Sequence, residues 1–442
     1  MEDALIIQGG KQLKGNVKVS GAKNVALKVI IASLLFDGEV VLKNIPKIAD
    51  VFELLDLIQK LGGKAQFEGD HTVVVEGKGI SKNRVDLLHG SKLRVSFMMF
   101  APLLQRYSIV SVPNPGGCRI GARPIDRIIE GMQKLGIIVS YDSNSGYYTA
   151  KLDKPPSGNY RFYKPSHTGT ELLIMLGMLA KSTVTISNAA QEPEIDELIA
   201  FLNAGGANIR KSQTTISISP SSKNLRLNEP FTIGGDRNEA VTFATLAVAT
   251  KGDITVSGLS LKLIASYLNE LKKVGAGVET INQNDFRVFY RGALNPTKVE
   301  TSPHPGFMTD WQPNLAVLMT QAKGESVIIE RVFENRFSYV SELRRLGAEI
   351  EFIRLPINNP LEYFFFNFDP SKKYNQAIKI TGPQALHGGV LTVSDLRAGA
   401  TLAIAALIAE GESVVNGLSI LERGYENFAE KITSLGGEIE KV

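Results

Sequence analysis

Residues 25–76 read VALKVIIASLLFDGEVVLKNIPKIADVFELLDLIQKLGGKAQFEGDHTVVVE. The stretch opens with residues 25–36, which are apolar at nearly every position, and passes through a Gly-Glu turn into a β-prone run at residues 40–42. An amphipathic run then ends at Gly62 and is followed by two hairpin-like strands. The first run predicts a buried helix, because a helix that is apolar on every face has no side to turn to water. The second predicts a helix that ends at a left-handed glycine.

The same succession occurs six times along the chain. The glycines that end the amphipathic runs are Gly62, Gly136, Gly206, Gly275, Gly347 and Gly436, at intervals of 74, 70, 69, 72 and 89 residues. The expected buried helices are Val25–Phe36, Val95–Leu104, Leu172–Ala180, Ala240–Ala249, Leu315–Ala322 and Ala398–Ala409. The short strands that follow them are expected at Val40–Leu42, Ile109–Val112, Thr183–Ile186, Ile254–Val256, Ser326–Ile329 and Ser413–Val415. A repeat of this period predicts six copies of one unit, of the form β-α-β-α-β-β.

Six such units exceed what one hydrophobic core supports, so we expect two lobes of three units each. The last unit stops at Val442 after one hairpin strand, and we expect Ala4–Gln8 to supply the missing one. The predicted lobes are therefore residues 22–232 and residues 1–21 with 233–442. The predicted fold class is α/β (α+β): a two-lobed inside-out α/β barrel, with parallel helices buried inside each lobe and sheets outside.

Composition indicates an ordinary soluble, cytoplasmic protein. Apolar residues make up 43% and charged residues 21% of the chain, and a net charge of +4 over 442 residues gives no argument for nucleic-acid binding. The N-terminal stretch does not resemble a signal peptide, and no apolar run is long enough to span a membrane. One cysteine excludes an internal disulfide, and the five histidines lack metal-ligand spacing. No phosphate loop, HExxH or nucleophile-elbow motif is present. We expect no metal and no cofactor.

The N-terminal ends of the predicted buried helices carry polar residues that an apolar helix does not need. They are Lys23-Asn24, Lys92 with Arg94, Ser166–Thr170, Asp236-Arg237, Thr309-Asp310, and Ser394-Asp395 with Arg397. A helix N-terminus already presents free N–H groups and a partial positive charge. Lysine and arginine there cost stability unless an anion is bound, which predicts a cleft for anionic ligands. For the aspartates, ordinary N-capping is an equally good interpretation.

A second unusual stretch is PNPGGCRIGARP at residues 113–124. Proline and glycine at this density predict a loop, and its Cys118 stands beside cationic residues that favour the thiolate. A single loop cysteine is often incidental. Together with the cationic helix ends, it predicts a reactive thiol.

Several motifs resemble those of the UDP-N-acetylglucosamine 1-carboxyvinyltransferase family, which belongs to the enolpyruvyl transferases. The matching stretches are Ser20–Asn24, Pro115–Pro124, Pro305–Phe307 with Thr309-Asp310, Phe333–Phe337, Ser394–Ala398 and Arg423–Glu426. The resemblance covers essentially the whole chain and implies two lobes of three βαβαββ units. It also implies transfer of the enolpyruvyl group of phosphoenolpyruvate to the 3'-hydroxyl of UDP-N-acetylglucosamine, with release of phosphate, through a tetrahedral ketal. That reaction is the first committed step of peptidoglycan biosynthesis, and its enzymes are targets of fosfomycin.

The resemblance also assigns residues. Cys118 matches the family's proton donor, and Asp310 matches the carboxylate near the sugar hydroxyl, the best candidate base. Lys23 and Arg397 match cations that bind phosphoenolpyruvate, with Asn24 beside them. The remaining substrate-binding candidates are Arg94 and Arg123 at the anions, the uridine segment Arg123, Pro124, Ile125, Asp126 and Arg127, the diphosphate segment Lys164, Pro165, Ser166 and His167, the UDP-sugar contact Val332, and Arg336 without a specific role.

Two stretches depart from the family pattern. The family usually has Val-Gly-Ala-Thr where this chain has His167-Thr168-Gly169-Thr170, and Lys28 stands where proline is common. Two alternatives remain open. One is the sister activity, 3-phosphoshikimate 1-carboxyvinyltransferase, which lacks the Pro-Gly-Gly-Cys loop. The other is a non-catalytic paralogue that binds UDP-sugars. The partners implied are small molecules only; no protein partner is indicated.

Overall fold

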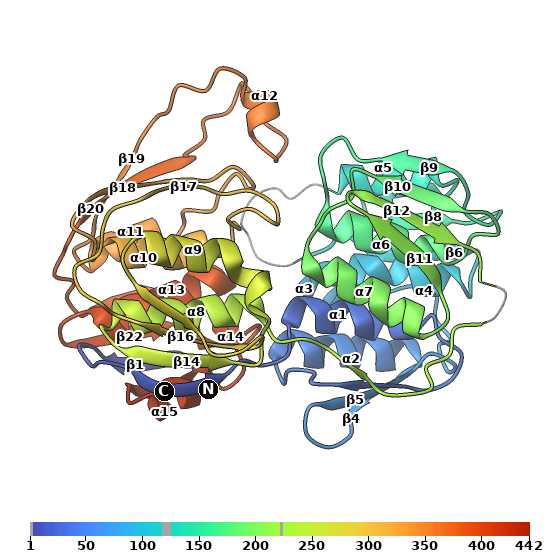
Figure 1. Cartoon of the computed structure of the whole chain (residues 1–442). Coiled ribbons are helices and arrows are strands. Elements are labelled where there is room, and N and C mark those ends of the chain that lie inside the picture. Colours follow the sequence, from blue (N-terminus) through green and yellow to red (C-terminus); the bar gives the residue numbers. More distant parts are fainter. Residues whose placement is uncertain (1–2, 117–124, 222–223) are drawn as a thin grey trace. The chain divides into compact units, whose positions relative to one another are not determined.

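The computed structural model describes residues 3–116, 125–221 and 224–442 (Figure 1). The described chain divides into two compact units. Unit 1 contains residues 3–20 and 235–442, and unit 2 contains the described residues between 21 and 234. Each unit has its own hydrophobic core, and each core cluster is built from residues of one unit alone. Helices and mixed sheets alternate along both units, which makes this an α/β fold.

The regular elements of unit 2 are α1 (Lys23–Ser33), β3 (Val40–Lys43), α2 (Ala49–Leu61), β4 (Lys64–Phe67), β5 (Thr72–Glu76), α3 (Leu87–Lys92), the 3-10 helix η1 (Arg94–Met99), α4 (Phe100–Leu104), β6 (Ile109–Pro113), α5 (Asp126–Lys134), β7 (Ile138–Asp142), β8 (Tyr147–Lys151), β9 (Asn159–Arg161), α6 (His167–Gly177), β10 (Val184–Ser187), α7 (Pro193–Ala204), β11 (Asn208–Ser212), β12 (Thr215–Ser219) and β13 (Phe231–Thr232).

Those of unit 1 are β1 (Ala4–Gln8), β2 (Lys14–Lys18), α8 (Arg237–Ala249), β14 (Asp253–Ser257), η2 (Leu261–Ile264), α9 (Ala265–Lys273), β15 (Gly277–Thr280), β16 (Asp285–Phe289), β17 (Lys298–Glu300), α10 (Gln312–Met319), β18 (Gly324–Ile329), α11 (Val340–Arg345), β19 (Glu349–Phe352), α12 (Pro360–Tyr363), β20 (Ala377–Gly382), β21 (Val390–Thr392), α13 (Leu396–Ile408), β22 (Glu412–Asn416), α14 (Leu418–Leu421), α15 (Phe428–Ser434) and β23 (Glu438–Lys441).

The six glycines that end the amphipathic runs have the left-handed conformation that the sequence predicts. All have a positive φ, between 89° and 100°, which side chains with a Cβ rarely adopt. Gly62, for example, caps α2 with its N–H bonded to the carbonyls of Gln59 and Ile58. The repeat is therefore real at the level of backbone conformation.

The sheets repeat as well. Five four-stranded sheets share one order: an edge strand, a strand parallel to it, and then two strands that continue the sheet in antiparallel pairing. They are β13-β3-β5-β4 and β9-β10-β12-β11 in unit 2, and β2-β14-β16-β15, β17-β18-β20-β19 and β21-β22-β1-β23 in unit 1. The sixth sheet, β6-β8-β7, has three strands, and a parallel bridge between Arg84 and Ser111 stands where the edge strand would be.

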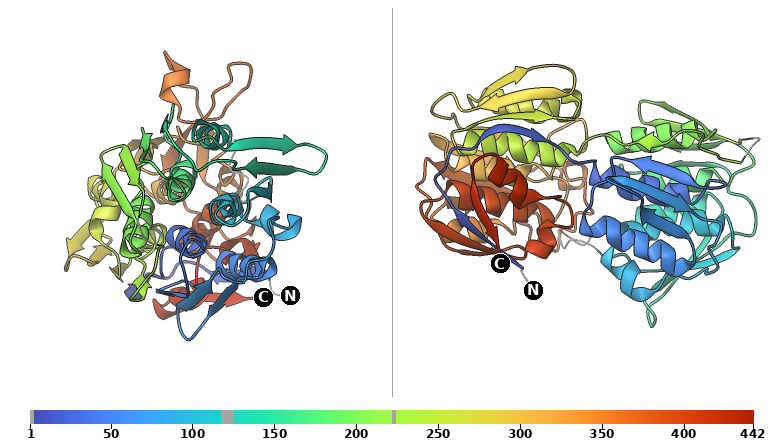
Figure 2. Two further views of the ribbon diagram at one scale, coloured as in Figure 1. Left: turned by 90° about the vertical axis from the view of Figure 1, so that its right-hand side faces the viewer. Right: turned by 90° about the horizontal axis from the view of Figure 1, so that it is seen from below.

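The N-terminal strand β1 lies between β22 and β23 and is antiparallel to both. The pairing expected for Ala4–Gln8 is therefore present, with Ile7 opposite Ser413 and Ile439. The two chain ends meet there, as Figure 2 shows, and Ala4 and Val442 exchange two backbone hydrogen bonds of 3.0 Å. Unit 1 is thus completed by both ends of the chain.

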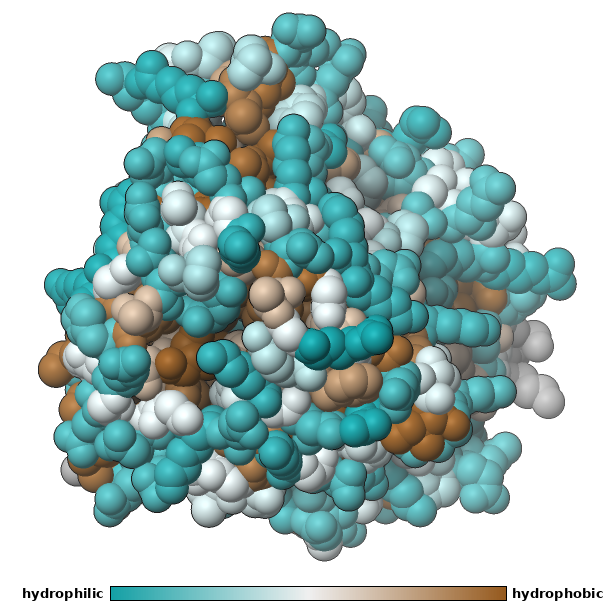
Figure 3. All heavy atoms as spheres, turned by 60° about the vertical axis from the view of Figure 1, so that its left-hand side comes forward, coloured by the Kyte–Doolittle hydropathy of each residue, from teal (hydrophilic) through white to brown (hydrophobic). Residues whose placement is uncertain are grey.

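The apolar runs form buried helices. All residues of α8 are buried, as are all but one of α13, and α10 packs against both. Strand residues alternate between buried and partly exposed, as in β12. The face in Figure 3 is mostly hydrophilic, with apolar side chains in scattered groups. Within the described residues, no helix is both long and apolar enough to cross a membrane.

The prediction of one continuous buried helix over Val95–Leu104 is wrong. The run Val95–Leu104 forms η1 and then α4, with a break at Phe100. Pro102 explains the break, because it has no N–H to bond the carbonyl of Met98 and its ring would clash there. Restarting the helix at Phe100 places Pro102 in a first turn, where no such bond is needed.

Candidate functional site

The structure shows which of the aspartates at the predicted helix starts are N-caps and which is not. Asp236 and Asp395 are N-caps: each carboxylate accepts two backbone N–H groups, of α8 and α13 respectively, at 2.7–3.1 Å. Asp310 makes no such cap, because Trp311 holds the N-cap position of α10 without a side-chain bond. The carboxylate of Asp310 therefore needs another explanation.

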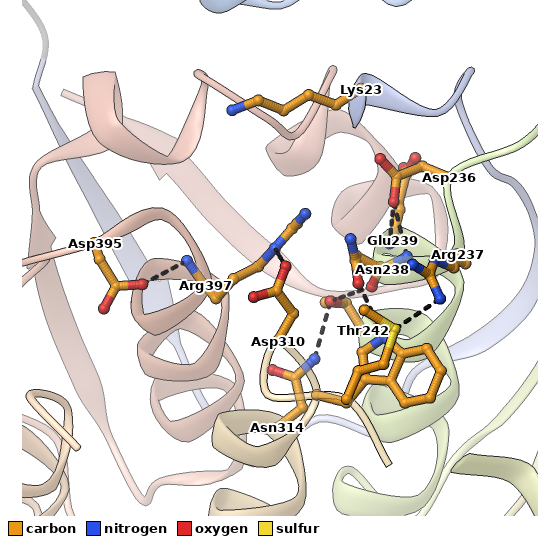
Figure 4. Close-up of polar contacts among 12 residues, drawn as sticks. Lys23, Asp236, Arg237, Asn238, Glu239, Thr242, Asp310, Asn314, Asp395 and Arg397 are labelled. Atoms are coloured by element: carbon orange, nitrogen blue, oxygen red, sulfur yellow. Dashed lines mark hydrogen bonds and ion pairs between the residues drawn. The ribbon is translucent and has the colours of Figure 1, made fainter. Parts of the chain in front are cut away.

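That explanation is a pair of arginines. Arg336 donates from one terminal nitrogen to Asp310 Oδ1 at 2.8 Å and from the other to Asp395 Oδ1 at 3.0 Å. Arg397 donates its Nε to Asp310 Oδ2 at 3.3 Å (Figure 4). We call Asp310, Arg336, Asp395 and Arg397 the Asp310 cluster. Both arginines are almost fully buried, whereas the Asp310 side chain is 23% exposed.

A polar layer fixes the three helices beneath the cluster. Thr242 of α8 accepts a hydrogen bond from the amide of Asn314 of α10 at 3.1 Å, and Thr401 of α13 donates to the same amide's oxygen at 2.9 Å. Tyr425 bonds Thr242 at 2.8 Å and lies under the guanidinium of Arg397. Each of these residues is buried. A buried network with satisfied partners rigidifies the elements that it joins, so the helix N-termini of unit 1 hold the Asp310 cluster in a fixed geometry.

The electrostatics of the cluster keep Asp310 ionised. Burial raises the pKa of its carboxyl, but the charges of Arg336 and Arg397 outweigh that effect and lower the pKa to about 2. One terminal nitrogen of Arg397, Nη1, is buried and has no hydrogen-bond partner among the described residues. A buried guanidinium with an unused donor is suited to an anionic ligand.

Arg237 and Trp311 lie at the start of α8 and α10. Arg237 donates to the sulfur of Met308 at 2.6 Å, and its guanidinium lies 5.8 Å from the Trp311 ring centre. Trp311 is 1% exposed, donates its ring N–H to Asn238 at 2.9 Å and packs against Tyr267. The tryptophan therefore belongs to the core of unit 1.

Val332 follows strand β18 in unit 1, and its position depends on a buried glutamate. Glu330 accepts the backbone N–H of Val332 at 2.7 Å and of Phe333 at 3.0 Å, and its other oxygen accepts the hydroxyl of Thr309 at 2.8 Å. Glu330 thereby connects Val332 to the segment that carries Asp310. The sequence does not single out Glu330.

In unit 2, the predicted residues lie at helix starts. Lys23 begins α1 and forms a buried 2.7 Å ion pair with Asp50 of α2, while Asn24 follows it. Arg94 is the first residue of η1. Lys23 is thus a cation at a helix N-terminus, as the sequence indicates, but a carboxylate already neutralises it.

The uridine and diphosphate segments also meet at helix starts. Ile125 is the N-cap residue of α5, which begins with Asp126 and Arg127. Ser166 caps α6 by accepting the N–H of Gly169 at 3.2 Å. Burial and the charge of Arg127 lower the pKa of Lys164, which indicates that the two segments lie close together. Cys118, Arg123 and Pro124 lie outside the described residues.

One buried group was missed by the sequence analysis. Glu171, one turn into α6, is fully buried and lies 3.0 Å from His167 Nε2 and 3.1 Å from Lys28 Nζ of α1. A glutamate inside an apolar helix, four residues after a histidine, is the signal that could have found it.

Comparisons with known proteins show the family of the chain. The family model described as EPSP synthase (3-phosphoshikimate 1-carboxyvinyltransferase) matches residues 7–432. The chain belongs to this enolpyruvyl transferase family. Among its relatives, a UDP-N-acetylglucosamine 1-carboxyvinyltransferase of Desulforapulum autotrophicum is 37% identical over 100% of both chains. Another of that name, from Rhodopseudomonas palustris, is 38% identical over 100% of this chain and 99% of its own.

Solved structures share the fold. The enolpyruvyl transferase NikO from Streptomyces tendae matches with a TM-score of 0.86 at 21% identity, covering 100% of this chain and 99% of its own. EPSP synthase from Acinetobacter baumannii matches with a TM-score of 0.74 at 17% identity, over 100% of both chains. At such identities the likeness concerns the fold alone.

Proposed function

We propose that this protein transfers the enolpyruvyl group of phosphoenolpyruvate to the 3'-hydroxyl of UDP-N-acetylglucosamine and releases phosphate. The observation that carries the proposal is the full-length identity of 37–38% to relatives that bear the name of this activity. The Asp310 cluster supports it, because it combines an ionised carboxylate with buried arginines. This activity is the first committed step of peptidoglycan biosynthesis, and we assign it to the cytoplasm.

The architecture proposed for this function is the two-lobed inside-out barrel. Three sheets and a core of buried helices in each unit support it. The lobes proposed are residues 22–232 and residues 1–21 with 233–442.

The reaction needs proton transfer at two places, the 3'-hydroxyl of the sugar and C3 of phosphoenolpyruvate. In the addition, the sugar 3'-oxygen bonds to C2 of phosphoenolpyruvate while its proton leaves and C3 gains a proton. In the elimination, C3 loses a proton and the C2–O bond to phosphate breaks, which leaves the enol ether. We assign Asp310 as the base for the hydroxyl and Cys118 as the acid that protonates C3.

A carboxylate with a pKa of about 2 is a weak base in the free protein. We infer that Arg397 changes the pKa of Asp310 when substrate binds. When its guanidinium pairs with the anionic groups of phosphoenolpyruvate, its charge no longer stabilises the Asp310 carboxylate alone, and the pKa of Asp310 rises. Substrate binding therefore strengthens the base. Lys23 and Asn24 are assigned to the same anions, and Arg336 holds the orientation of Asp310.

The groups of unit 2 are assigned to the nucleotide sugar. We assign residues 123–127 to uridine and residues 164–167 to the diphosphate, with Arg94 as a further cation and Val332 of unit 1 as a sugar contact. Helix N-termini at α5 and α6 support these assignments, because their N–H groups and partial charge favour anions.

The test is phosphate release from phosphoenolpyruvate with either acceptor, followed by mass spectrometry of the product. We expect release only with UDP-N-acetylglucosamine and a product heavier by one carboxyvinyl group. Release only with shikimate 3-phosphate would establish the sister activity, which is the description of the matching family model. Binding of UDP-N-acetylglucosamine without release under either condition would establish a non-catalytic paralogue.

A further inference from the structure

Two cations from different helices share one buried carboxylate oxygen in unit 2. Lys28 Nζ of α1 and His167 Nε2 of α6 lie 3.1 Å and 3.0 Å from the same Oε1 of Glu171. The side chains of Lys28 and Glu171 are 6% and 0% exposed, whereas that of His167 is 25% exposed. We call these three residues the Glu171 triad. Only its histidine reaches the surface.

The charges around His167 favour its protonated form. It is faced by Glu171 on its own helix, by Lys28 on α1 and by Glu192 at the start of α7. Burial lowers the pKa of the imidazole, but the Glu171 carboxylate, with a smaller contribution from Glu192, more than offsets burial and Lys28 and raises the pKa above its usual value. The surroundings therefore favour the imidazolium form of His167 over the neutral ring.

The two ring nitrogens of His167 have different surroundings. Nε2 is buried and lies 3.0 Å from Glu171 Oε1, so a ligand outside the core would bond to Nδ1. His167 is also the first residue of α6, an 11-residue helix whose N-cap, Ser166, belongs to the proposed diphosphate segment. The imidazolium and the helix N-terminus therefore present positive charge at one place.

The buried carboxylate of Glu171 needs the two cations beside it. Both Glu171 oxygens and His167 Nε2 are buried and have no hydrogen-bond partner among the described residues, so charge at 3.0–3.1 Å, rather than aligned hydrogen bonds, compensates this carboxylate. A buried carboxylate is costly unless cations compensate it. Lys28 and His167 are the two cationic side chains beside this carboxylate.

We propose that the Glu171 triad makes binding of the nucleotide sugar proton-linked: Glu171 and Lys28 are positioning residues that hold His167 as an imidazolium whose Nδ1–H donates to the diphosphate. This inference rests on the proposed function for the identity of the ligand. The diphosphate of UDP-N-acetylglucosamine is doubly esterified and stays a dianion at neutral pH, so the ligand itself does not titrate there. Any pH dependence of its binding near neutrality then reports on the protein.

The sign of the effect follows from linkage. The ligand binds the protonated histidine better, so affinity is highest below the pKa of His167 in the free protein and falls as pH rises through it. The decline is at most about tenfold per pH unit. Glu171→Gln removes the group that raises this pKa and moves the decline to lower pH. Lys28→Met removes a cation that lowers the pKa and moves the decline to higher pH. His167→Gln abolishes the decline.

The experiment is calorimetric titration of the intact protein with UDP-N-acetylglucosamine alone, at steps from about pH 5.5 to 9, beside NMR titration of the histidine ring signals. The matched control is His71→Asn. His71 is a partly exposed histidine of the same unit beside Asp70, with a left-handed backbone that asparagine tolerates. We expect the control to follow the wild type.

Opposite shifts in Glu171→Gln and Lys28→Met would support the proposal. Weaker binding in both variants at every pH, with no movement of the decline, would overturn it, because a merely structural triad has that result. If Glu171→Gln does not fold, the other two variants still decide. A wild-type protein that does not bind UDP-N-acetylglucosamine would contradict the proposed function instead.

Discussion

At the residue scale, Asp310 is the group whose removal separates chemistry from binding. Asparagine has the same shape but cannot take a proton. We expect Asp310→Asn to lower kcat about 10²- to 10⁴-fold while the Kd for UDP-N-acetylglucosamine changes little. Stopped-flow turnover and calorimetry measure the two quantities. Asp369→Asn, a change at an exposed carboxylate, is the control. Near-normal turnover in Asp310→Asn would remove it from the base role.

Arg336 gives the second prediction at this scale. It bridges Asp310 and Asp395, and lysine cannot reach both carboxylates as a fork does. We expect Arg336→Lys to destabilise unit 1 by about 3 kcal/mol at neutral pH. The pKa of Asp310 is lowered in the folded protein, so its stabilisation is present above the unfolded value and is lost as pH falls toward 2. The gap between variant and wild type should therefore shrink below about pH 4.

The single tryptophan makes this measurable. Trp311 is buried in unit 1, so its fluorescence during urea unfolding reports on that unit. Arg345→Lys is the matched control, because Arg345 pairs with Glu342 but is 64% exposed, and such pairs contribute less than about 1 kcal/mol. An Arg336→Lys variant as stable as the control would contradict the prediction.

Much of the site was predictable at this scale because charge at an apolar helix end is visible in sequence. Asp310 and Arg397 are found this way and lie together. The sequence could not say that Asp395 caps a helix while Asp310 does not, because both precede an apolar run. It also could not pair Lys28 with Glu171, since residues 143 positions apart meet only through the packing of α1 and α6.

At the element scale, β1 is the strand on which unit 1 depends. Its residue Ile7 is fully buried between β22 and β23, while Ile6 faces the other side of the sheet and is partly exposed. We expect Ile7→Ala to cost about 2–5 kcal/mol of the stability of unit 1, because it leaves a cavity in the core. Ile6→Ala is the control and should cost clearly less. Equal losses by tryptophan fluorescence would show that β1 packs differently.

The helices and strands were predicted well where the hydrophobic pattern was regular, and less well where a capping residue, a proline or an insertion changed the element. The run Ala240–Ala249 forms α8, which begins three residues earlier because Asp236 caps it. Pro102 breaks the run Val95–Leu104, although the apolar pattern continues through it. The interval of 89 residues before Gly436 contains the segment between β19 and β20, including α12, which the repeat alone does not predict. Hydrophobic periodicity alone does not reveal the missing N–H of a proline, nor a segment inserted between two strands.

At the scale of the whole molecule, the chain order and the order in space differ. Unit 1 takes β1 and β2 from residues before unit 2, and the rest from residues after it. The strands of unit 2 all lie between residues 21 and 234, and β13 returns at its end to pair with β3. All strands of unit 2 therefore come from between residues 21 and 234, whereas those of unit 1 come from both ends of the chain.

This difference predicts how fragments behave. We expect residues 21–234 to fold alone, because no sheet of unit 2 borrows a strand. Residues 235–442 alone should fail to fold, because β14 loses β2 while β22 and β23 both lose β1, which exposes open sheet edges. Joining Val442 to Met1 through a short flexible linker, in the order 235–442, linker, 1–20, should restore a folded unit, because Ala4 and Val442 are already hydrogen-bonded.

The fragments are compared by amide dispersion in NMR spectra and by Trp311 emission, which is shifted to the blue only when the core around it forms. The permuted fragment should unfold cooperatively near the transition of unit 1 in the full chain. Ile7→Ala in the permuted fragment should destabilise it as much as in the intact protein, which ties the rescue to β1 rather than to added length. Folding of residues 235–442 without residues 1–20 would show that the two N-terminal strands are dispensable, and that unit 1 does not need both ends of the chain.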